Sequence, residues 1–339
     1  MTWPAQFTDE HHLEEVMSRP SEALVRELGA LQGNIMVLGA AGKMGPTLAR
    51  MAKRAAPNKR VMAVARFSEP GLFESMQSQG IECLRADLLD PVALRDLPDA
   101  DHVVFMAGRK FGSQGSEWLT WAMNAHVPAL VAQRYAQANF CVFSTACVYP
   151  FVSVEGAGAT ESSPLTPVGE YANSCVARER LFQHFSHALG IRGTLLRLSY
   201  AIDMRYGVLH DLAQALIEQR PIALAMGHAN LIWQGDANEI ALRSLCRTQQ
   251  PMVPLNLSGP MVSIRSAAVA LAERLGTTAR FEGQESSTAW LVDCSRMNDW
   301  FGPPRVTLDQ MLDATAAWVS QGQASLGKPT HFEVRHGHY

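Results

Sequence analysis

The chain has 339 residues, of which 47% are hydrophobic and 18% are charged, and its formal net charge at pH 7 is −3. This length allows about two domains, and this apolar content can bury a large core. The sequence has no basic tract, so its charge does not favour binding to nucleic acid. No apolar run approaches the ~18 residues of a membrane-spanning helix. We therefore expect a soluble globular protein that binds neither nucleic acid nor membrane.

The cysteines and the N-terminus favour a cytoplasmic protein. The sequence contains six cysteines, none of them in a C-x-x-C pair or in a spacing typical of a metal site. We therefore expect free thiols in a reducing compartment, without a bound metal. Residues 1–16 are polar and acidic, unlike a secretory signal peptide.

The first predicted element is a helix within an N-terminal extension, residues 1–33. Ser21 is placed to cap the start of this helix with its hydroxyl oxygen, and Gly33 is placed to end it. The extension is therefore expected to be helical.

The next segment carries the strongest functional signal. The apolar run 35–38 predicts a buried strand, residues 46–55 predict a helix, and a glycine-rich turn joins the two. Glycines let the backbone approach a ligand without a Cβ in the way, and a helix N-terminus offers unpaired N–H groups. This arrangement predicts a site for the pyrophosphate of a dinucleotide. Its residues are Gly39, Gly42, Lys43, Met44 and Gly45.

Strands and helices alternate from this turn to about residue 200. Residues 118–139 favour a helix, which Pro128 should kink or restart. Strands separated by helices are typical of a parallel sheet covered on both faces, so we expect an α/β fold with a Rossmann-type, doubly wound parallel sheet. Ligands of such sheets bind beyond the carboxyl ends of the strands. Further strands are predicted at residues 61–65, 81–84, 103–106, 140–143 and 194–198.

The pattern changes after residue 200, where glycines, prolines and short apolar runs alternate. Amphipathic helices are predicted at 264–275 and 308–319. We expect a smaller C-terminal domain that closes over the ligand. The predicted organisation is an extension at 1–33, a dinucleotide-binding domain at 34–200 with a return near 229–258, and a substrate-binding domain with a tail at 201–339.

Taken together and in their order along the chain, these motifs resemble those of the extended short-chain dehydrogenase/reductase family, which includes the NAD(P)-dependent sugar epimerases and dehydratases. The glycine turn matches the family's G-x-x-G-x-x-G, residues 144–149 resemble its S-[ST]-x-x-V-Y motif, and Tyr171 falls at its catalytic tyrosine. The resemblance covers roughly residues 34–322 and implies a nicotinamide cofactor, a sugar-like substrate and a homodimer through paired helices. The helices in question would be the region 118–135 and the one that carries Leu181, Phe182, Phe185 and Leu189.

The resemblance also implies roles for individual residues. Tyr171 would exchange the hydroxyl proton of the substrate and contact the cofactor, Thr145 would hydrogen-bond the same oxygen, and Asn124 would help to relay protons. The hydride would pass between a substrate carbon and the nicotinamide. The residues matched along the cofactor are Asp87, at the adenine, Leu88, Ala107 and Gly108.

The chain departs from the family pattern Tyr-x-x-x-Lys, because Cys175 stands four residues after Tyr171. Residues four apart share a helix face, so a lysine there would lie beside the tyrosine. The resemblance implies that this lysine bonds the nicotinamide ribose and lowers the tyrosine pKa. A neutral thiol supplies no such charge. Either another cation replaces the lysine, with Lys110 beside Arg109 as the candidate, or Tyr171 acts as a neutral acid. An ordinary solvated loop lysine is the alternative for Lys110.

The end of the second strand bears on the choice of cofactor. NAD binders usually carry an acidic residue there for the ribose 2′-hydroxyl, whereas this chain has Arg66 and no carboxylate before Glu69. Arginine suits a 2′-phosphate, which favours NADP over NAD, although Arg66 could instead stack on the adenine.

Polar residues after the strand at 194–198 are candidates for substrate binding. Arg205 would bind a carboxylate or phosphate, or would instead pair with Asp203 or Asp211. His228 and Trp233 belong to a polar and aromatic cluster that suits a polyol. The substrate candidates are Arg109, Thr145, Tyr200, Arg205, His228 and Trp233.

We therefore expect an NAD(P)-dependent oxidoreductase, epimerase or dehydratase that acts on a sugar-like small molecule by hydride transfer. These residues do not determine whether the hydride is kept or returned. The alternative is an NAD(P)-binding sensor or scaffold without chemistry. The missing lysine favours that alternative, and the presence of Tyr171 and Thr145 opposes it.

Overall fold

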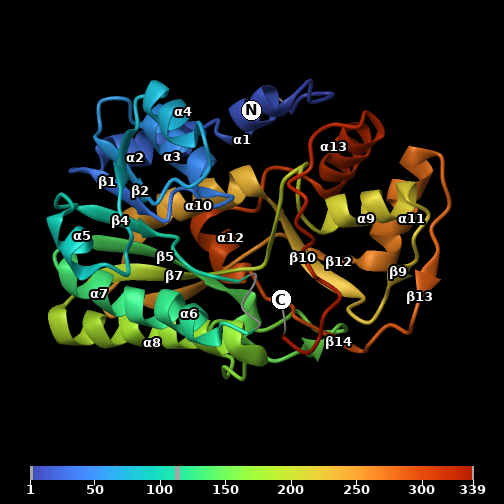
Figure 1. Cartoon of the computed structure of the whole chain (residues 1–339). Helices are drawn as coiled ribbons and strands as arrows, with labels where there is room; N and C mark the ends of the chain where they lie inside the picture. Colours follow the sequence, from blue (N-terminus) through green and yellow to red (C-terminus); the bar gives the residue numbers. More distant parts are fainter. Residues whose placement is uncertain (1–2, 111–114, 338–339) are drawn as a thin grey trace.

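A seven-stranded parallel sheet forms one half of the molecule in the computed structural model, which describes residues 3–110 and 115–337 (Figure 1). The strands lie in the order β11-β7-β5-β4-β1-β2-β3, and every neighbouring pair is parallel. This arrangement confirms the predicted Rossmann-type α/β fold. The strands are β1 Ile35–Leu38, β2 Val61–Ala65, β3 Glu82–Arg85, β4 His102–Phe105, β5 Asn139–Thr145, β7 Arg192–Leu198 and β11 Val253–Leu257.

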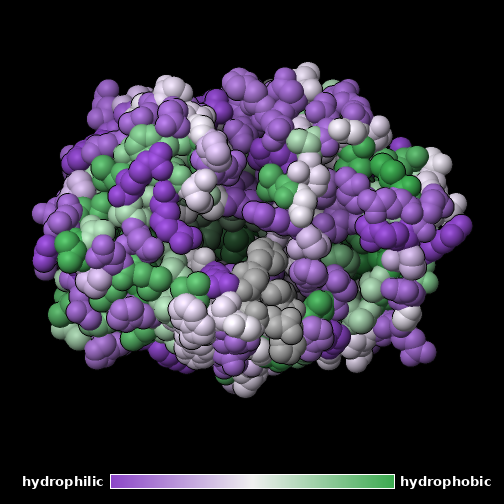
Figure 2. Space-filling model, in the orientation of Figure 1, coloured by the Kyte–Doolittle hydropathy of each residue, from purple (hydrophilic) through white to green (hydrophobic). Residues whose placement is uncertain are grey.

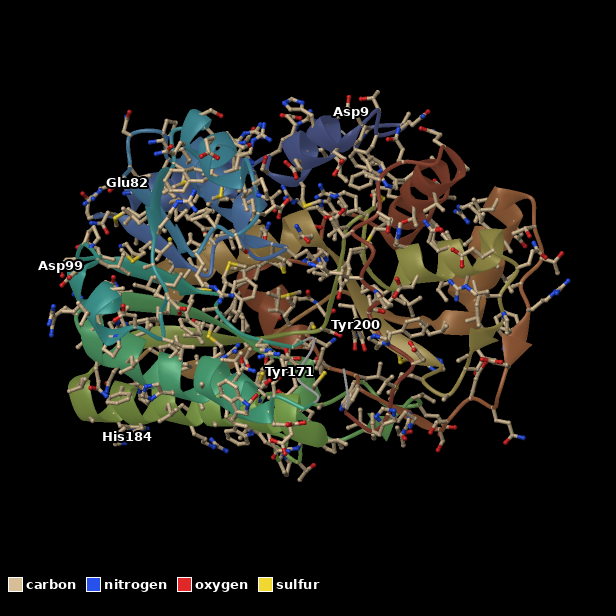
Figure 3. The ribbon with its side chains drawn as sticks, in the orientation of Figure 1. Asp9, Glu82, Asp99, Tyr171, His184 and Tyr200 are labelled. Carbon is tan, nitrogen blue, oxygen red and sulfur yellow. The ribbon has the colours of Figure 1, made fainter. Side chains whose placement is uncertain are left out.

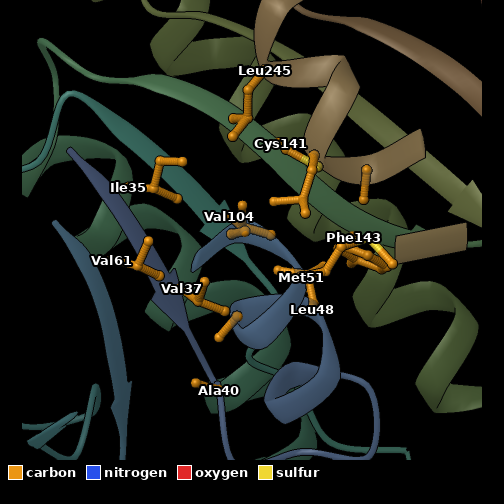
Figure 4. Close-up of a cluster of buried hydrophobic side chains, with 14 of the residues drawn as sticks. Ile35, Val37, Ala40, Leu48, Met51, Val61, Val104, Cys141, Phe143 and Leu245 are labelled. Atoms are coloured by element: carbon orange, nitrogen blue, oxygen red, sulfur yellow. The ribbon is translucent and has the colours of Figure 1, made fainter. Parts of the chain in front are cut away.

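Helices cover both faces of this sheet because its strands are apolar on both sides. In β1, Ile35 and Val37 face a cluster shared with α2, α3 and α10, whereas Met36 and Leu38 face a cluster shared with α5, α7 and α8. Figure 4 shows the first cluster, in which Leu48 and other α3 side chains lie against the strands. These helices are α2 Glu22–Ala30, α3 Gly45–Ala55, α5 Pro91–Asp96, α7 Val127–Arg134, α8 Gly169–Leu189 and α10 Gln234–Ser244, with α4 Leu72–Ser78 between β2 and β3.

Two local predictions about helix boundaries are confirmed. Ser21 caps α2, since its hydroxyl oxygen accepts a hydrogen bond from the Leu24 N–H at 3.1 Å. Pro128 lies in the first turn of α7, and a π-helical turn at Ala122–His126 separates α7 from α6, Glu117–Trp121. Proline lacks an N–H and starts a new segment here, as its chemistry dictates.

A smaller sheet organises the other half, on the right of Figure 1. Its strand order is β12-β10-β8, and its core combines Trp233 with side chains of α1, α9, α11 and α13. The N-terminal extension contributes to both halves, because α1 packs on this core and α2 packs on the larger sheet. The elements are α1 Glu10–Met17, β8 Tyr200–Ile202, α9 Val208–Ile217, β10 His228–Trp233, β12 Met261–Ser263, α11 Ile264–Leu275 and α13 Leu308–Ser320.

Short elements connect these parts. They are two ribbons, β6 Val152–Ser153 with β14 Thr288–Ala289 and β9 Ile222–Ala223 with β13 Phe281–Glu282, the helix α12 Ser295–Phe301, and 3-10 turns at Ala146–Val148 and Leu245–Arg247. All six cysteines are free thiols. Across residues 3–110 and 115–337, no helix is both long enough and apolar enough to pass through a bilayer.

Candidate active site

The carboxyl ends of β1 and β4 open into a crevice between the two halves. The strand order reverses at β1, which pairs with both β2 and β4, and ligands of doubly wound sheets bind at such a point. Two adjoining cavities, of about 310 and 250 Å³, share Gly39, Gly42, Met106 and Gly108 in their walls. Figure 2 shows a hollow between the halves on this face, with hydrophobic residues at its floor.

Steric constraints explain the glycines of the turn at the edge of this crevice. Gly39 has φ +87°, and a Cβ there would lie 2.6 Å from the backbone nitrogen of Ala107. A Cβ on Gly45 would lie 2.3 Å from the carbonyl oxygen of Ala40. At Gly42 the nearest atom to a Cβ would be 3.4 Å away, so the missing side chain there leaves room in the cavities.

The smaller cavity gathers the residues that the sequence places along the adenosine part of a dinucleotide. Arg66 is exposed at its rim, after β2, and the Asp87 carboxylate accepts a hydrogen bond from the Leu89 N–H at 3.0 Å. The predicted residues that line it are Gly39, Gly42, Arg66, Asp87, Leu88, Ala107 and Gly108.

The larger cavity gathers the predicted catalytic side chains. Tyr171, in the first turn of α8, and Thr145, at the end of β5, line it and hydrogen-bond each other. Figure 3 shows Tyr171 and Tyr200 near the middle of the molecule, between the two halves. Burial raises the pKa of the Tyr171 phenol, whereas the Arg178 guanidinium and the Thr145 hydrogen bond act in the opposite direction. The phenol is therefore protonated at neutral pH in this state.

Further predicted residues surround this pair. Trp290 and Thr330, from the C-terminal part of the chain, complete the wall and were not predicted from the sequence. The predicted residues that line the larger cavity are Gly39, Gly42, Lys43, Met44, Gly45, Gly108, Arg109, Lys110, Thr145, Tyr171 and Tyr200.

Asn124 lies behind the cavity, and its role differs from the expected one. Its Oδ1 accepts hydrogen bonds from the Arg109 N–H and from Arg178 Nη2, both at 2.8 Å. Its Nδ2 donates to the Arg109 carbonyl and to Ser174 Oγ, both at 2.9 Å. An amide accepts two and donates two hydrogen bonds, so Asn124 has no capacity left to relay a proton. The π-helical turn instead uses Asn124 to fix the loop after β4.

A comparison with a family model gives evidence on the family of this chain that is independent of the structure. The model of the NAD dependent epimerase/dehydratase family matches residues 35–218, which is more than half of the chain. The chain belongs to this family. A comparison with curated proteins gives no match.

Solved epimerases and dehydratases share the fold of this family member. UDP-glucuronic acid 4-epimerase from Bacillus cereus, solved with UDP-glucuronic acid and NAD, aligns over 85% of this chain and 99% of its own, with 20% identity and a TM-score of 0.70. dTDP-glucose 4,6-dehydratase from Bacillus anthracis, solved with NAD, aligns over 86% and 97%, with 15% identity and a TM-score of 0.73. At these identities the likeness establishes the fold alone.

Three of the predicted substrate residues do not line the cavity that holds Tyr171, although Arg205 lines a neighbouring one. Arg205 is held by three carboxylates, with 2.9 Å to Asp203 and 3.0 Å to both Glu10 and Glu14. The ion-pair alternative is therefore correct for Arg205, which anchors α1 to the second half. Trp233 is 2% exposed and packs on Trp3 and Phe7, so it is a core residue and not a substrate contact. His228 starts β10, opposite Ser263, and lines neither cavity.

A buried ion pair lies behind the predicted catalytic side chains of this epimerase/dehydratase family member. Arg197 on β7 pairs with Glu179 on α8 at 2.7 Å, and their side chains are 3% and 0% exposed. Ser144 Oγ donates to the same carboxylate at 2.6 Å, and Arg197 Nη1 donates to Tyr149 OH at 2.6 Å. The network therefore ties α8, which carries Tyr171, to β5, which carries Thr145.

Lys43 reaches from the glycine turn across the crevice. Its Nζ donates to the Ala201 carbonyl at 2.9 Å and lies 4.2 Å from the centre of the Tyr206 ring. Burial lowers the pKa of Lys43 to about 8, against the opposing influence of Asp203 and Asp211. The lysine is therefore charged at pH 7 and largely neutral at pH 9.

This titration predicts a pH dependence of binding. A phosphate-bearing ligand favours charged Lys43, so the Kd for a nicotinamide dinucleotide should rise about tenfold between pH 7 and pH 9. Calorimetric titration at the two pH values measures this change. Lys43→Met should bind more weakly at pH 7 and show a much smaller rise. An equal rise in the wild type and in Lys43→Met would contradict the assignment.

Proposed function

We propose that this protein is an enzyme that binds a nicotinamide dinucleotide in the two adjoining cavities and transfers hydride to or from a sugar-like substrate. The observation that carries the proposal is the Tyr171–Thr145 pair, in a cavity continuous with the glycine turn. Gly42 leaves space at the cavities for a pyrophosphate, whereas Gly39 and Gly45 allow the turn to pack closely on the neighbouring backbone. The cofactor, when bound, supplies the hydride acceptor or donor.

The residues of the chain supply the proton chemistry. The protonated Tyr171 phenol is the form that donates a proton to a carbonyl oxygen under reduction. In the reverse direction the Tyr171 phenolate takes the proton of a substrate hydroxyl and becomes the neutral phenol again. Thr145 hydrogen-bonds the same oxygen and fixes its position. Arg109 and Tyr200 line the cavity where the remainder of the substrate would lie.

The substrate class we propose is a sugar linked to a nucleotide. The solved relatives of the same fold include an epimerase with UDP-glucuronic acid bound, and this family acts as epimerases and dehydratases. Incubation with cofactor and a panel of UDP- and dTDP-sugars tests the proposal. An enzyme that returns the hydride converts the sugar without lasting absorbance at 340 nm, and one that keeps it accumulates that absorbance. If no sugar is converted and no absorbance at 340 nm accumulates, the result contradicts the proposed substrate class.

We also propose that the protein binds NADP in preference to NAD. Arg66 is exposed at the rim of the smaller cavity, and Asp87 is the one acidic residue among the described residues that line this cavity. A charge-assisted contact predicts that Arg66→Ala weakens NADPH binding by about 10- to 100-fold and leaves NADH binding nearly unchanged. Calorimetric Kd values for both cofactors measure this difference. An equal loss for the two would mean that Arg66 stacks on the adenine.

We further propose that the protein forms a homodimer in the cytoplasm. The exposed tryptophans beside α8 support the dimer. Trp118 on α6 is 72% exposed, whereas Phe182, expected on the same face, is fully buried against Phe105 and is not available to a partner. Light scattering should give twice the 37.1 kDa of one chain. Trp118→Glu should shift the mass toward one chain, whereas a charge at exposed Val92 on α5 should not. A wild-type monomer would contradict the dimer.

A further inference from the structure

Arg178 is a buried cation beside the larger cavity that no sequence motif singled out. It lies on α8 seven residues after Tyr171, on the same helix face, and is 5% exposed in the cavity wall. Its Nη1 donates to the Phe143 carbonyl at 2.7 Å and its Nη2 to Asn124 Oδ1 at 2.8 Å. These two contacts fix the plane of the guanidinium between β5 and the loop after β4.

Among the described residues, no carboxylate pairs with Arg178, whose guanidinium lies 5.7 Å from the centre of the Phe105 ring. In the ranges 3–110 and 115–337, no carboxylate lies within 4.0 Å of its guanidinium, and its buried Nε has no hydrogen-bond partner. A buried charge costs several kcal/mol unless it is paired. Glu179, the next residue, is already paired with Arg197. A buried guanidinium at a cavity wall, with no carboxylate partner among the described residues and with spare N–H donors, indicates a ligand group that completes its hydrogen bonds.

The loop after β4 is shaped around this guanidinium. A Cβ on Gly108 would lie 2.5 Å from Arg178 Nη2 and 3.0 Å from Asn124 Oδ1. A side chain at this position would therefore displace the Arg178 guanidinium or the Asn124 amide. Gly108 lines both cavities, whereas Arg178 lines only the larger one, which holds Tyr171.

We propose that Arg178 is the cation of the nicotinamide end of this site, where it hydrogen-bonds the nicotinamide ribose and holds positive charge beside the Tyr171 phenol. The inference rests on the proposed function. Lys110, the candidate from the sequence, also lines the cavity, but burial lowers its pKa. A guanidinium stays charged at every physiological pH and offers several donors in a fixed plane. Cys175, one turn closer to Tyr171, stays a neutral thiol because burial raises its pKa.

A comparison of two ligands tests the inference without reliance on turnover. Arg178→Met should weaken calorimetric binding of NADPH by about 10- to 100-fold, the usual range for a charged hydrogen bond. It should leave adenosine 2′,5′-bisphosphate, which lacks the nicotinamide ribose, within about twofold of the wild type. Arg180→Met, on the exposed side of α8, is the matched control and should change neither Kd. Equal loss for both ligands, or a larger selective loss in Lys110→Met, would overturn the inference.

Restoring the charge one helical turn earlier provides the second test. Arg178→Lys should retain most of the NADPH affinity, and Cys175→Lys introduced into Arg178→Met should recover at least tenfold of the lost affinity and of kcat. Cys175→Lys alone should gain nothing, because it places a second cation against Arg178. If neither Arg178→Lys nor Cys175→Lys in Arg178→Met keeps or recovers affinity, the inference is wrong. The proposed function is still supported in that case if the wild type binds NADPH and turns over substrate. A wild type that binds neither NADPH nor NADH removes the proposed function itself.

Discussion

Tyr171→Phe should lower kcat by about 10²- to 10⁴-fold, the usual contribution of a positioned acid or base. The variant removes the phenol oxygen that exchanges a proton with the substrate. It keeps the ring in the cavity wall and the Thr145 side chain beside it. The Kd for NADPH should therefore stay within about threefold of the wild type, since the lost factor acts in the transition state. Steady-state kinetics and calorimetry on the same preparations separate the two effects.

A second buried phenol gives the matched control. Tyr135 is 3% exposed, donates to the Pro98 carbonyl at 3.2 Å and lines neither cavity. Tyr135→Phe should leave kcat unchanged. Full activity in Tyr171→Phe would contradict the role of Tyr171. A wild type that binds the dinucleotide but converts no substrate would instead agree with the sensor or scaffold alternative.

The second large effect concerns stability. Arg197→Met should lower the free energy of unfolding by about 3–5 kcal/mol, because it leaves the Glu179 carboxylate buried without its cation. Arg197 contacts that carboxylate with both Nε and Nη2, and Ser144 supplies the remaining hydrogen bond. Urea denaturation followed by circular dichroism measures the loss. Because the pair ties α8 to β5, the folded variant should also lose activity.

The exposed pair of Arg60 and Glu82 is the matched control for this substitution. Their side chains are 47% and 40% exposed, although the geometry is also bidentate. Surface ion pairs contribute about 0–1 kcal/mol, so Arg60→Met should change stability by no more than that. A similar loss in the two variants would mean that burial of the Arg197–Glu179 pair does not govern its contribution.

Local sequence patterns predicted the part of the fold that forms the first half of the crevice. The bounds of β1 and β2 match the predicted strands, and α11 matches its predicted helix residue for residue. These elements have strong local signals, either a continuous apolar run or amphipathic spacing with a capping residue. The glycine turn was predictable because its steric demands act over a few residues.

Elements with weak local signals were missed. β11 contains Pro254, and it lies at the edge of the sheet, where proline is tolerated. The polar helix α1 was not predicted, because most of what stabilises it lies elsewhere in the chain, in the core and at Arg205. Arg178 could have been found from its spacing, since residues seven apart lie on the same helix face as Tyr171.

Trp233 and Arg205 do not line the Tyr171 cavity for the same reason. Trp233 is covered by Trp3 and Phe7, and Arg205 is neutralised in part by Glu10 and Glu14, all from the first residues of the chain. Nothing local in residues 200–233 indicates these partners. Long-range contacts therefore decided which polar and aromatic residues face the cavity.

The most direct measurement is a calorimetric titration of the purified protein with NADPH and with NADH. We expect one dinucleotide to bind per chain, NADPH more tightly than NADH, and a bulky acidic side chain at Gly42 to abolish the heat while the fold is retained. An absence of heat with both reduced cofactors, from a protein shown to be folded, would contradict the central claim that this crevice binds a nicotinamide dinucleotide.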